Sequence, residues 1–384
     1  MSAPGRDTST GDQARGGGAA VVKSWVGEHR RGVTTLVVAI LAVLLPFGVS
    51  QYWRATLVFI VVAAIGALGL DVLTGRTGQI SLGHAAFLGA GAYTAGYLGG
   101  NHHLTAALWI PAAGVVAGLL GAIVGPTALR LRGLYLAIVT IGLVFIAQHV
   151  FVNVTAISGG PGGRSLPPPT FGSLDFANGT SIGSLQITRD ELYYFLALLL
   201  LALGMLYVRN LQRTHLGRGM AAVRERELAA AVLGVHVART KVTAFVISSA
   251  MAGVAGALYA SYLGFVVPTQ WDLTISIEYV VMIVVGGMAS LWGPVLGAVF
   301  VIGLPALLQD VSGSLPFLSN GLGGGIISVT DTSTIVFGVL LVVFLLVEPR
   351  GVVGLGRRIW EIGMRWRGRR RTPVATAKVG EVSQ

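Results

Sequence analysis

The sequence has no cysteine among its 384 residues, and charged residues make up only 11% of it. The first absence excludes disulfide bonds, thiolate nucleophiles and cysteine-based metal sites. The charged share is about half that of a typical soluble domain. Apolar residues make up 53% of the chain, and the mean hydropathy is +0.75. We therefore expect most of the chain to face lipid or other membrane spans.

Several motifs of enzymes are absent as well. No G-x-x-x-x-G-K-[ST] segment occurs, so we expect no nucleotide site in this chain. Neither H-E-x-x-H nor G-x-S-x-G occurs. We predict a protein that is not an enzyme, with no catalytic residue, no metal site and no cofactor; if ATP drives it, partner subunits must use the nucleotide. The formal charge of +11 is typical of loops that orient a membrane protein, so we predict no nucleic-acid partner.

The long apolar runs predict an all-α fold, a polytopic membrane bundle with about ten transmembrane spans. The 55 glycines favour close packing between these helices. The third, eighth and ninth runs are rich in glycine and can be either full spans or broken, re-entrant helices. In chain order the ten runs are 33–50, 54–73, 79–100, 104–125, 133–152, 191–208, 242–264, 275–291, 292–310 and 330–347.

Lysine and arginine divide unevenly between the two sides that these spans define. With the N-terminus in the cytoplasm, 24 of the 27 basic residues fall on the cytoplasmic side. This distribution is what the positive-inside rule predicts. We therefore expect both termini in the cytoplasm, with a flexible tail over 1–32, a transmembrane domain over 33–347 and a basic tail over 348–384. The segment 153–190, rich in glycine and proline, is the predicted external loop.

The cytoplasmic loop 209–241 interrupts the apolar runs with the longest charged stretch. Within it, Met220 to Gly234 predicts a short helix that ends at the glycine. Leu228 falls on a small apolar face of this helix, and Arg224 and Glu227 flank that face. Two interpretations stay open from the residues alone. The helix can dock into a groove of a partner protein, or lie on anionic lipid through its arginines.

Two glycine-rich segments are candidates for a translocation path. Polar side chains and spaced glycines inside a span suit a broken helix that lines a path, but they also suit close helix packing, and both interpretations stay open. The candidate residues of the first segment are Gly78, Gln79, Ser81, Gly83 and His84. Those of the second are Gly286, Gly287 and Ser290, just before Pro294.

Acidic residues near the ends of the spans form another small group. Asp71 lies near the end of the second span, where pairing with Arg76 would lower the cost of placing a charge in the membrane. Asp272 and Glu278 lie at the outer end of the eighth span. They can face an outer mouth of the path or be ordinary solvated carboxylates.

Four stretches resemble the permease subunits of branched-chain amino-acid ABC importers of the LivM type. They are Gly78–Tyr93 (GQISLGHAAFLGAGAY), Leu131–Thr140 (LRGLYLAIVT), the central loop running into Ala244–Ser248 (AFVIS), and Glu348–Gly351 (EPRG). The resemblance runs from residue 78 to residue 351 and leaves both tails uncovered.

The resemblance implies a coupling helix in the central loop that contacts an ATPase subunit. Related permeases carry E-A-A-x-x-x-G there, and this chain matches it at Ala229, Ala230 and Gly234. Leu228 occupies the acidic position, and Glu227 comes one residue earlier.

The resemblance also implies the rest of the assembly: a second permease subunit, two cytoplasmic ATPase subunits and an extracytoplasmic substrate-binding protein, in the inner membrane of a bacterium. Two other functions stay open at this stage. One is an importer of urea or short amides, and the other is a secondary transporter or channel that uses no ATPase.

Overall fold

The computed structural model describes residues 40–314 apart from 128–130, 132, 172–173, 178 and 183–184, together with residues 338, 339, 342, 351, 352 and 354. The chain divides into two compact units, residues 1–54 and 55–384. In the first unit a 3-10 turn, Leu45–Gly48, precedes the first residues of helix α2. The elements described below belong to the second unit. Residues 33–39 of the first predicted span, and all of the span 330–347 except residues 338, 339 and 342, lie outside the described residues.

Within the described part of the chain, six helices are long and apolar enough to cross a membrane by length and composition. The described part of the chain is thus essentially helical, as the sequence predicts, and the six do not by themselves fix the number of spans. They are Gln51–Gly75, Ala106–Val124, Tyr135–Asn153, Arg189–Arg213, Val237–Leu263 and Gly293–Asp310.

The first of these helices forms the centre of the bundle. Helix α2 (Gln51–Leu70) continues into a π-helical turn over Asp71–Gly75. In its most apolar window 89% of the residues are buried, against 28% in the window of α6 (Leu134–Asn153). Because α2 is apolar and enclosed on most sides, the other helices pack around it.

Glycine allows three helices to approach one another closely. Helix α11 (Val237–Leu263) packs against α3 (His84–Ala95) and α4 (Ala106–Val124). A Cβ atom on Gly91 of α3 would collide with the backbone of Gly253 in α11. Small residues at such crossings let the backbones of two helices touch directly, as is usual between membrane helices.

Helix α8 (Arg189–Arg213) begins two residues before the predicted run 191–208. Thr188 and Glu191 form a capping box, in which the Thr188 backbone N–H donates to the Glu191 carboxylate at 2.8 Å. This bond satisfies the backbone N–H of the N-cap residue.

Of the three doubtful runs, the third is helical over only part of its length, the eighth is shorter than a membrane, and the ninth is continuous. Helix α3 follows an extended segment and runs into a π-helical turn over Gly96–Asn101. Helix α12 covers only Leu273–Gly286, about 21 Å at 1.5 Å per residue. After a loop, the chain continues as α13 (Gly293–Ala298), a π-helical turn (Val299–Gly303) and α14 (Leu304–Ser314) without interruption. Pro294 lies in the first turn of α13, where a missing N–H costs nothing.

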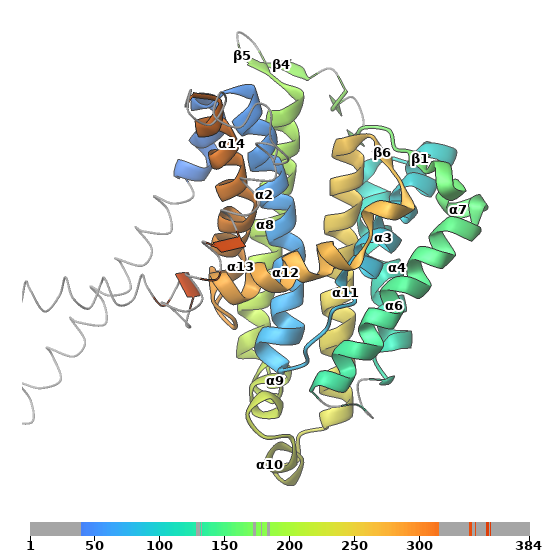
Figure 1. The fold of residues 1–384 in the computed structure, drawn as a ribbon, viewed down its shortest axis with the longest axis vertical. Helices are drawn as coiled ribbons and strands as arrows, with labels where there is room; N and C mark the ends of the chain where they lie inside the picture. The colour runs from blue at the N-terminus through green and yellow to red at the C-terminus, as the bar shows by residue number, and fades with distance from the viewer. Residues whose placement is uncertain are drawn as a thin grey trace, which may run out of the picture. The chain divides into compact units, whose positions relative to one another are not determined.

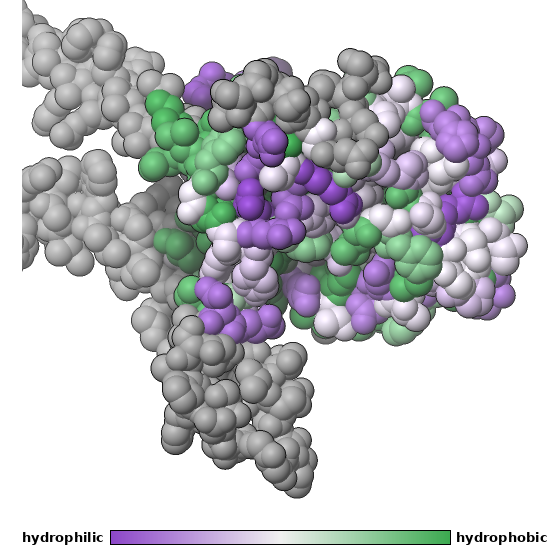
Figure 2. All heavy atoms as spheres, turned by 90° about the horizontal axis from the view of Figure 1, so that it is seen from above, coloured by the Kyte–Doolittle hydropathy of each residue, from purple (hydrophilic) through white to green (hydrophobic). Residues whose placement is uncertain are grey.

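Short antiparallel strand pairs, two of them hairpins, gather at one end of this unit, called here the hairpin end (Figure 1). After α6 come α7 (Thr155–Ser158) and a 3-10 turn (Gly160–Gly162). Strands β1 (Arg164–Ser165) and β6 (Phe265–Val266) pair antiparallel, as do β2 (Thr170–Phe171) with β3 (Leu174–Asp175) and β4 (Thr180–Ile182) with β5 (Leu185–Ile187). A 3-10 turn, Pro268–Gln270, leads from β6 to α12. Seen onto this end, hydrophilic residues cover much of the described surface (Figure 2).

The opposite end carries two short helices that join α8 to α11 (Figure 1). They are α9 (His215–Glu225) and α10 (Glu227–Val232), and they form what we call the α9–α10 end.

Candidate functional site

The α9–α10 end differs from the single helix that the sequence predicts over Met220 to Gly234. The chain is helical up to Glu225, becomes extended at Arg226 (φ −155°, ψ 109°) and is helical again from Glu227. The predicted stop is confirmed, because Gly234 has a φ of +83°, a conformation that favours glycine. The prediction of one helix was wrong because it counted helix propensity alone. The break lets α9 and α10 bury different faces: Met220 and Val223 in α9, and Ala230 in α10.

Helix α10 is fixed to α11 by an ion pair. The Glu227 carboxylate contacts the Lys241 ammonium group, whose side chain is only 3% exposed. Ala230, at 1% exposure, packs on the same side. This pairing gives Glu227 a structural role within the chain, a role that the motif comparison had left undefined.

The outer side of α10 carries apolar side chains without cover from the described part of the chain. Leu228 is 73% exposed, and Val232 and Leu233 are 88% and 80% exposed. Arg224, Ala229 and Gly234 are exposed beside them. Single exposed apolar residues are ordinary, but a cluster bordered by charge marks a contact surface. We call Leu228, Val232 and Leu233 the α10 patch.

Beneath α9, a buried charged cluster joins three segments of the chain. The Asp71 carboxylate accepts from the Arg76 guanidinium (Nε to Oδ2, 3.1 Å) and from the backbone N–H of Ala289 (N to Oδ1, 2.6 Å). Asp71 has no exposed surface and Arg76 is 8% exposed. The expected pairing of these two residues is therefore confirmed, while the bond to Ala289 was not foreseen. Arg224 of α9 packs nearby, 3.4 Å from where a Cβ on Gly78 would lie.

The first candidate path segment, from Gly78 to His84, is mostly buried in packing contacts. Gln79, Ser81 and His84 are 5%, 1% and 2% exposed, and Gly78 is exposed. The Gln79 amide donates to the Lys241 carbonyl at 3.5 Å, and the His84 ring lies 4.8 Å from the ring of Tyr279 in α12. A Cβ on Gly83 would press on Thr140 of α6.

The second candidate segment forms the turn between α12 and α13. A Cβ on Gly286 would collide with the Gly293 carbonyl, and Gly287 has a φ of 110°. Ser290 is partly exposed. Residues next to the first segment connect it to the second. Asp71, which precedes the first segment, accepts from the Ala289 N–H in the turn, and the N–H of Ala85, which follows His84, donates to the Ser276 hydroxyl of α12 at 3.0 Å.

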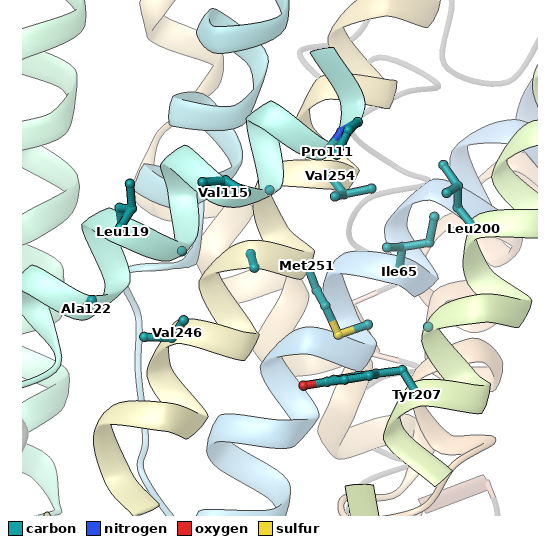
Figure 3. A pocket seen from close by; sticks show the side chains of 14 residues that line it. Ile65, Pro111, Val115, Leu119, Ala122, Leu200, Tyr207, Val246, Met251 and Val254 are labelled. Carbon is teal, nitrogen blue, oxygen red and sulfur yellow. The ribbon is translucent and has the colours of Figure 1, made fainter. Parts of the chain in front are cut away.

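A large apolar groove lies away from both segments. It has a volume of about 570 Å³ and is lined by residues of α2, α4, α8 and α11, among them Ile65, Val115, Tyr207 and Met251 (Figure 3). The Tyr207 hydroxyl is the one side-chain polar group in this lining. Such a groove offers nothing to either charged end of an amino acid and suits apolar chains.

These features define a class before any comparison is made. A helical membrane bundle with broken helices and a small helical projection at one end is the architecture of a transport subunit. A family model described as "Branched-chain amino acid transport system / permease component" matches residues 52–345. The chain belongs to this family, and it is a multi-pass membrane transport subunit and not an enzyme.

Individual relatives agree with this assignment. The high-affinity branched-chain amino-acid permease protein LivM of Salmonella typhimurium is 34% identical over 84% of this chain and 75% of its own length. LivM of Escherichia coli is 34% identical over 83% of this chain and 74% of its length. The permease LivH of Escherichia coli is 26% identical over 76% of this chain and 91% of its own length. No solved structure is significantly similar to the chain.

Proposed function

We propose that this protein imports branched-chain amino acids as one permease subunit of an ABC importer, with the α10 patch as the contact for an ATPase subunit. The observation that carries the proposal is the exposure of Leu228, Val232 and Leu233 on a short helix that is fixed to α11 through Glu227 and Lys241. Because α10 is exposed on one side and paired to α11 on the other, a partner that displaces α10 would also displace α11 within the bundle. ATP is then bound and hydrolysed by the partner subunits.

The remaining partners follow from the same proposal. Relatives named LivM and LivH belong to branched-chain amino-acid transport systems. We infer that this chain pairs with a second permease, two ATPase subunits and an extracytoplasmic binding protein. The broken helices α3 and α12 and the turn at Gly286 and Gly287 would adjoin the path between the two permeases.

The proposed topology has ten spans and both termini in the cytoplasm. It places the α9–α10 end in the cytoplasm and the hairpin end outside, in accord with the distribution of lysine and arginine. We expect reporter fusions after residue 175, in β3, and after residue 215, in α9, to report opposite sides of the membrane. The measurement uses a periplasmic and a cytoplasmic reporter at each position, and signals from the same side would contradict the span count.

The ATPase contact can be tested on the α10 patch. Changing Leu228 to Glu places a charge in the proposed interface and is expected to weaken binding of the ATPase subunit by about 2 kcal/mol, roughly thirtyfold in affinity. The readout is recovery of the ATPase with the tagged permease after detergent extraction. Phe265→Glu, an exposed position in β6 at the hairpin end, is the matched control and should leave recovery unchanged. Normal recovery with Leu228→Glu would instead favour an anionic lipid surface as the partner of this end.

A further inference from the structure

A second and smaller cavity lies between α2, α3, α11, α12 and the π-helical turn before α14. Its volume is about 260 Å³, below the roughly 300–1,000 Å³ of pockets for drug-sized ligands, so it suits a molecule of amino-acid size. Phe59 lies in the first half of α2, and Tyr259 lies four residues before the end of α11. Both positions are nearer to the hairpin end than to the α9–α10 end. The cavity is therefore on the side from which an importer receives its substrate.

One wall of this cavity is aromatic. The ring centroids of Phe59 and Tyr259 are 5.6 Å apart, and those of Tyr259 and Trp271 are 5.8 Å apart. Trp271 is 1% exposed and Tyr279 is 7% exposed, so these rings are held by the surrounding helices. Aromatic faces attract a cation that lies within about 6 Å of the ring centroid.

The charge of the cavity is negative. Glu278 lines it and is itself exposed, while none of the ten lining residues is Lys, Arg or His. A carboxylate beside aromatic faces favours an ammonium group and disfavours an anion. This composition sets the cavity apart from the groove of Figure 3, whose lining has no charged residue.

The rest of the lining is aliphatic. Leu88, Met282 and Ile302 complete the cavity together with Ala63 and Ile275. Burying a Leu-sized side chain against such a surface contributes about 1.5–3 kcal/mol. A ligand that fits both halves therefore carries an ammonium group at one end and a short aliphatic chain at the other.

We propose that this cavity is a transit site for an aliphatic amino acid, with the ammonium group at Glu278 and the side chain between Phe59, Met282 and Ile302. The inference rests on the proposed import of branched-chain amino acids and adds the chemistry of the contact. The ligand carboxylate meets no basic side chain among the lining residues and stays in water. The ligand binds weakly, because one of its two charges is left unpaired. Weak binding suits a site that must release its substrate in every cycle.

Because the natural chain has no cysteine, a thiol introduced into it is the one maleimide site on this subunit, whose labelling is followed separately from that of its partners. Ile275→Cys places a thiol in the cavity wall, and Ile277→Cys places one on the same helix outside the lining, at a position that is 46% exposed. Both are made in the complete transporter with its partner subunits in membrane vesicles, and maleimide labelling is followed with and without leucine. In the Ile275→Cys variant the labelling rate should fall by the factor 1 + [leucine]/Kd, about tenfold when leucine is at ten times its Kd. Labelling of the Ile277→Cys variant should not change.

Ligand analogues then test the role of charge. Isopentylamine, which is leucine without its carboxylate, should protect the thiol at position 275, whereas isocaproate, which lacks the ammonium group, should not. Adding Glu278→Gln to Ile275→Cys should remove protection by leucine, measured against this double variant's own labelling rate without ligand, which should rise because the neighbouring carboxylate no longer disfavours the thiolate. If Ile275→Cys fails to assemble, Ile302→Cys offers the same test from another wall.

Equal protection at positions 275 and 277, or no protection at 275 in a transporter that still takes up leucine, would overturn the proposed site. Protection that persists with Glu278→Gln would overturn the role of the carboxylate. Failure of the importer itself gives a different result. The unaltered complete transporter would then take up no branched-chain amino acid, while isopentylamine could still be seen to protect the thiol of the Ile275→Cys variant.

Discussion

Replacing Asp71 with leucine is expected to lower the stability of the folded protein by about 3–5 kcal/mol, because it leaves a buried guanidinium without its counter-ion. Arg76 is 8% exposed, and a guanidinium cannot shed its proton to escape the cost of burial. The Ala289 N–H loses its acceptor in the same step. Ala289 has a φ of 60°, unusual for a residue with a side chain, so the turn between α12 and α13 relies on this hydrogen bond.

A series of variants separates charge from hydrogen bonding. Asp71→Asn keeps an acceptor for Ala289 but removes the charge, and adding Arg76→Gln then removes the buried cation as well. The double variant should recover most of the stability that Asp71→Asn loses. Thermal unfolding in detergent measures the series. A leucine variant as stable as the natural protein, or a double variant no better than Asp71→Asn, would contradict the assigned role of the cluster.

Valine at Gly256 should be nearly as damaging, for a steric reason. A Cβ at this position falls on the backbone of Leu88, where α11 crosses α3, and backbone atoms cannot rotate aside as a side chain can. Overpacking a core costs about 1–3 kcal/mol where side chains can adjust, so we expect a loss at or above the upper end of that range. The measurements are the yield of monodisperse protein and its melting temperature.

Gly142 provides the matched control. It lies within α6, and no atom outside its own helix neighbourhood comes within 4 Å of a Cβ built there. Valine at Gly142 should be tolerated, since valine is if anything a slightly better helix former than glycine. Equal effects at positions 142 and 256 would mean that helix crossing is not what requires Gly256.

The sequence predicted those features that depend on a few neighbouring residues. Apolar length located the helices, Gly234 ended the helix it was expected to end, and Asp71 paired with Arg76, five residues away. Glycine content marked the third, eighth and ninth runs as either full spans or broken helices, and it could not decide between the two. In the structure the ninth run is a continuous helix from Gly293 to Ser314, whereas the helix of the eighth run ends at Gly286.

The features that sequence could not predict join distant segments. Asp71 bonds to Ala289, 218 residues away, and no local pattern specifies that pair. The break at Arg226 also depends on tertiary contacts, since it allows Glu227 to reach Lys241. The cavity beside Glu278 is built from five separate segments, so its residues could be recognised singly but not as a set. The path residues and the ATPase contact stay predictions.

The length of helix α11 connects the α9–α10 end to the cavity of Glu278. At 27 residues it is a rod about 40 Å long. Lys241 near one end holds α10, and Tyr259 near the other lines the cavity of Glu278. A rigid rod tilted by about 3° around its middle moves each tip by about 1 Å, in opposite directions. Movement at the α10 end of α11 can therefore reach the cavity without a series of side-chain rearrangements between them, because the displacement of the far tip follows from the length of one stiff helix.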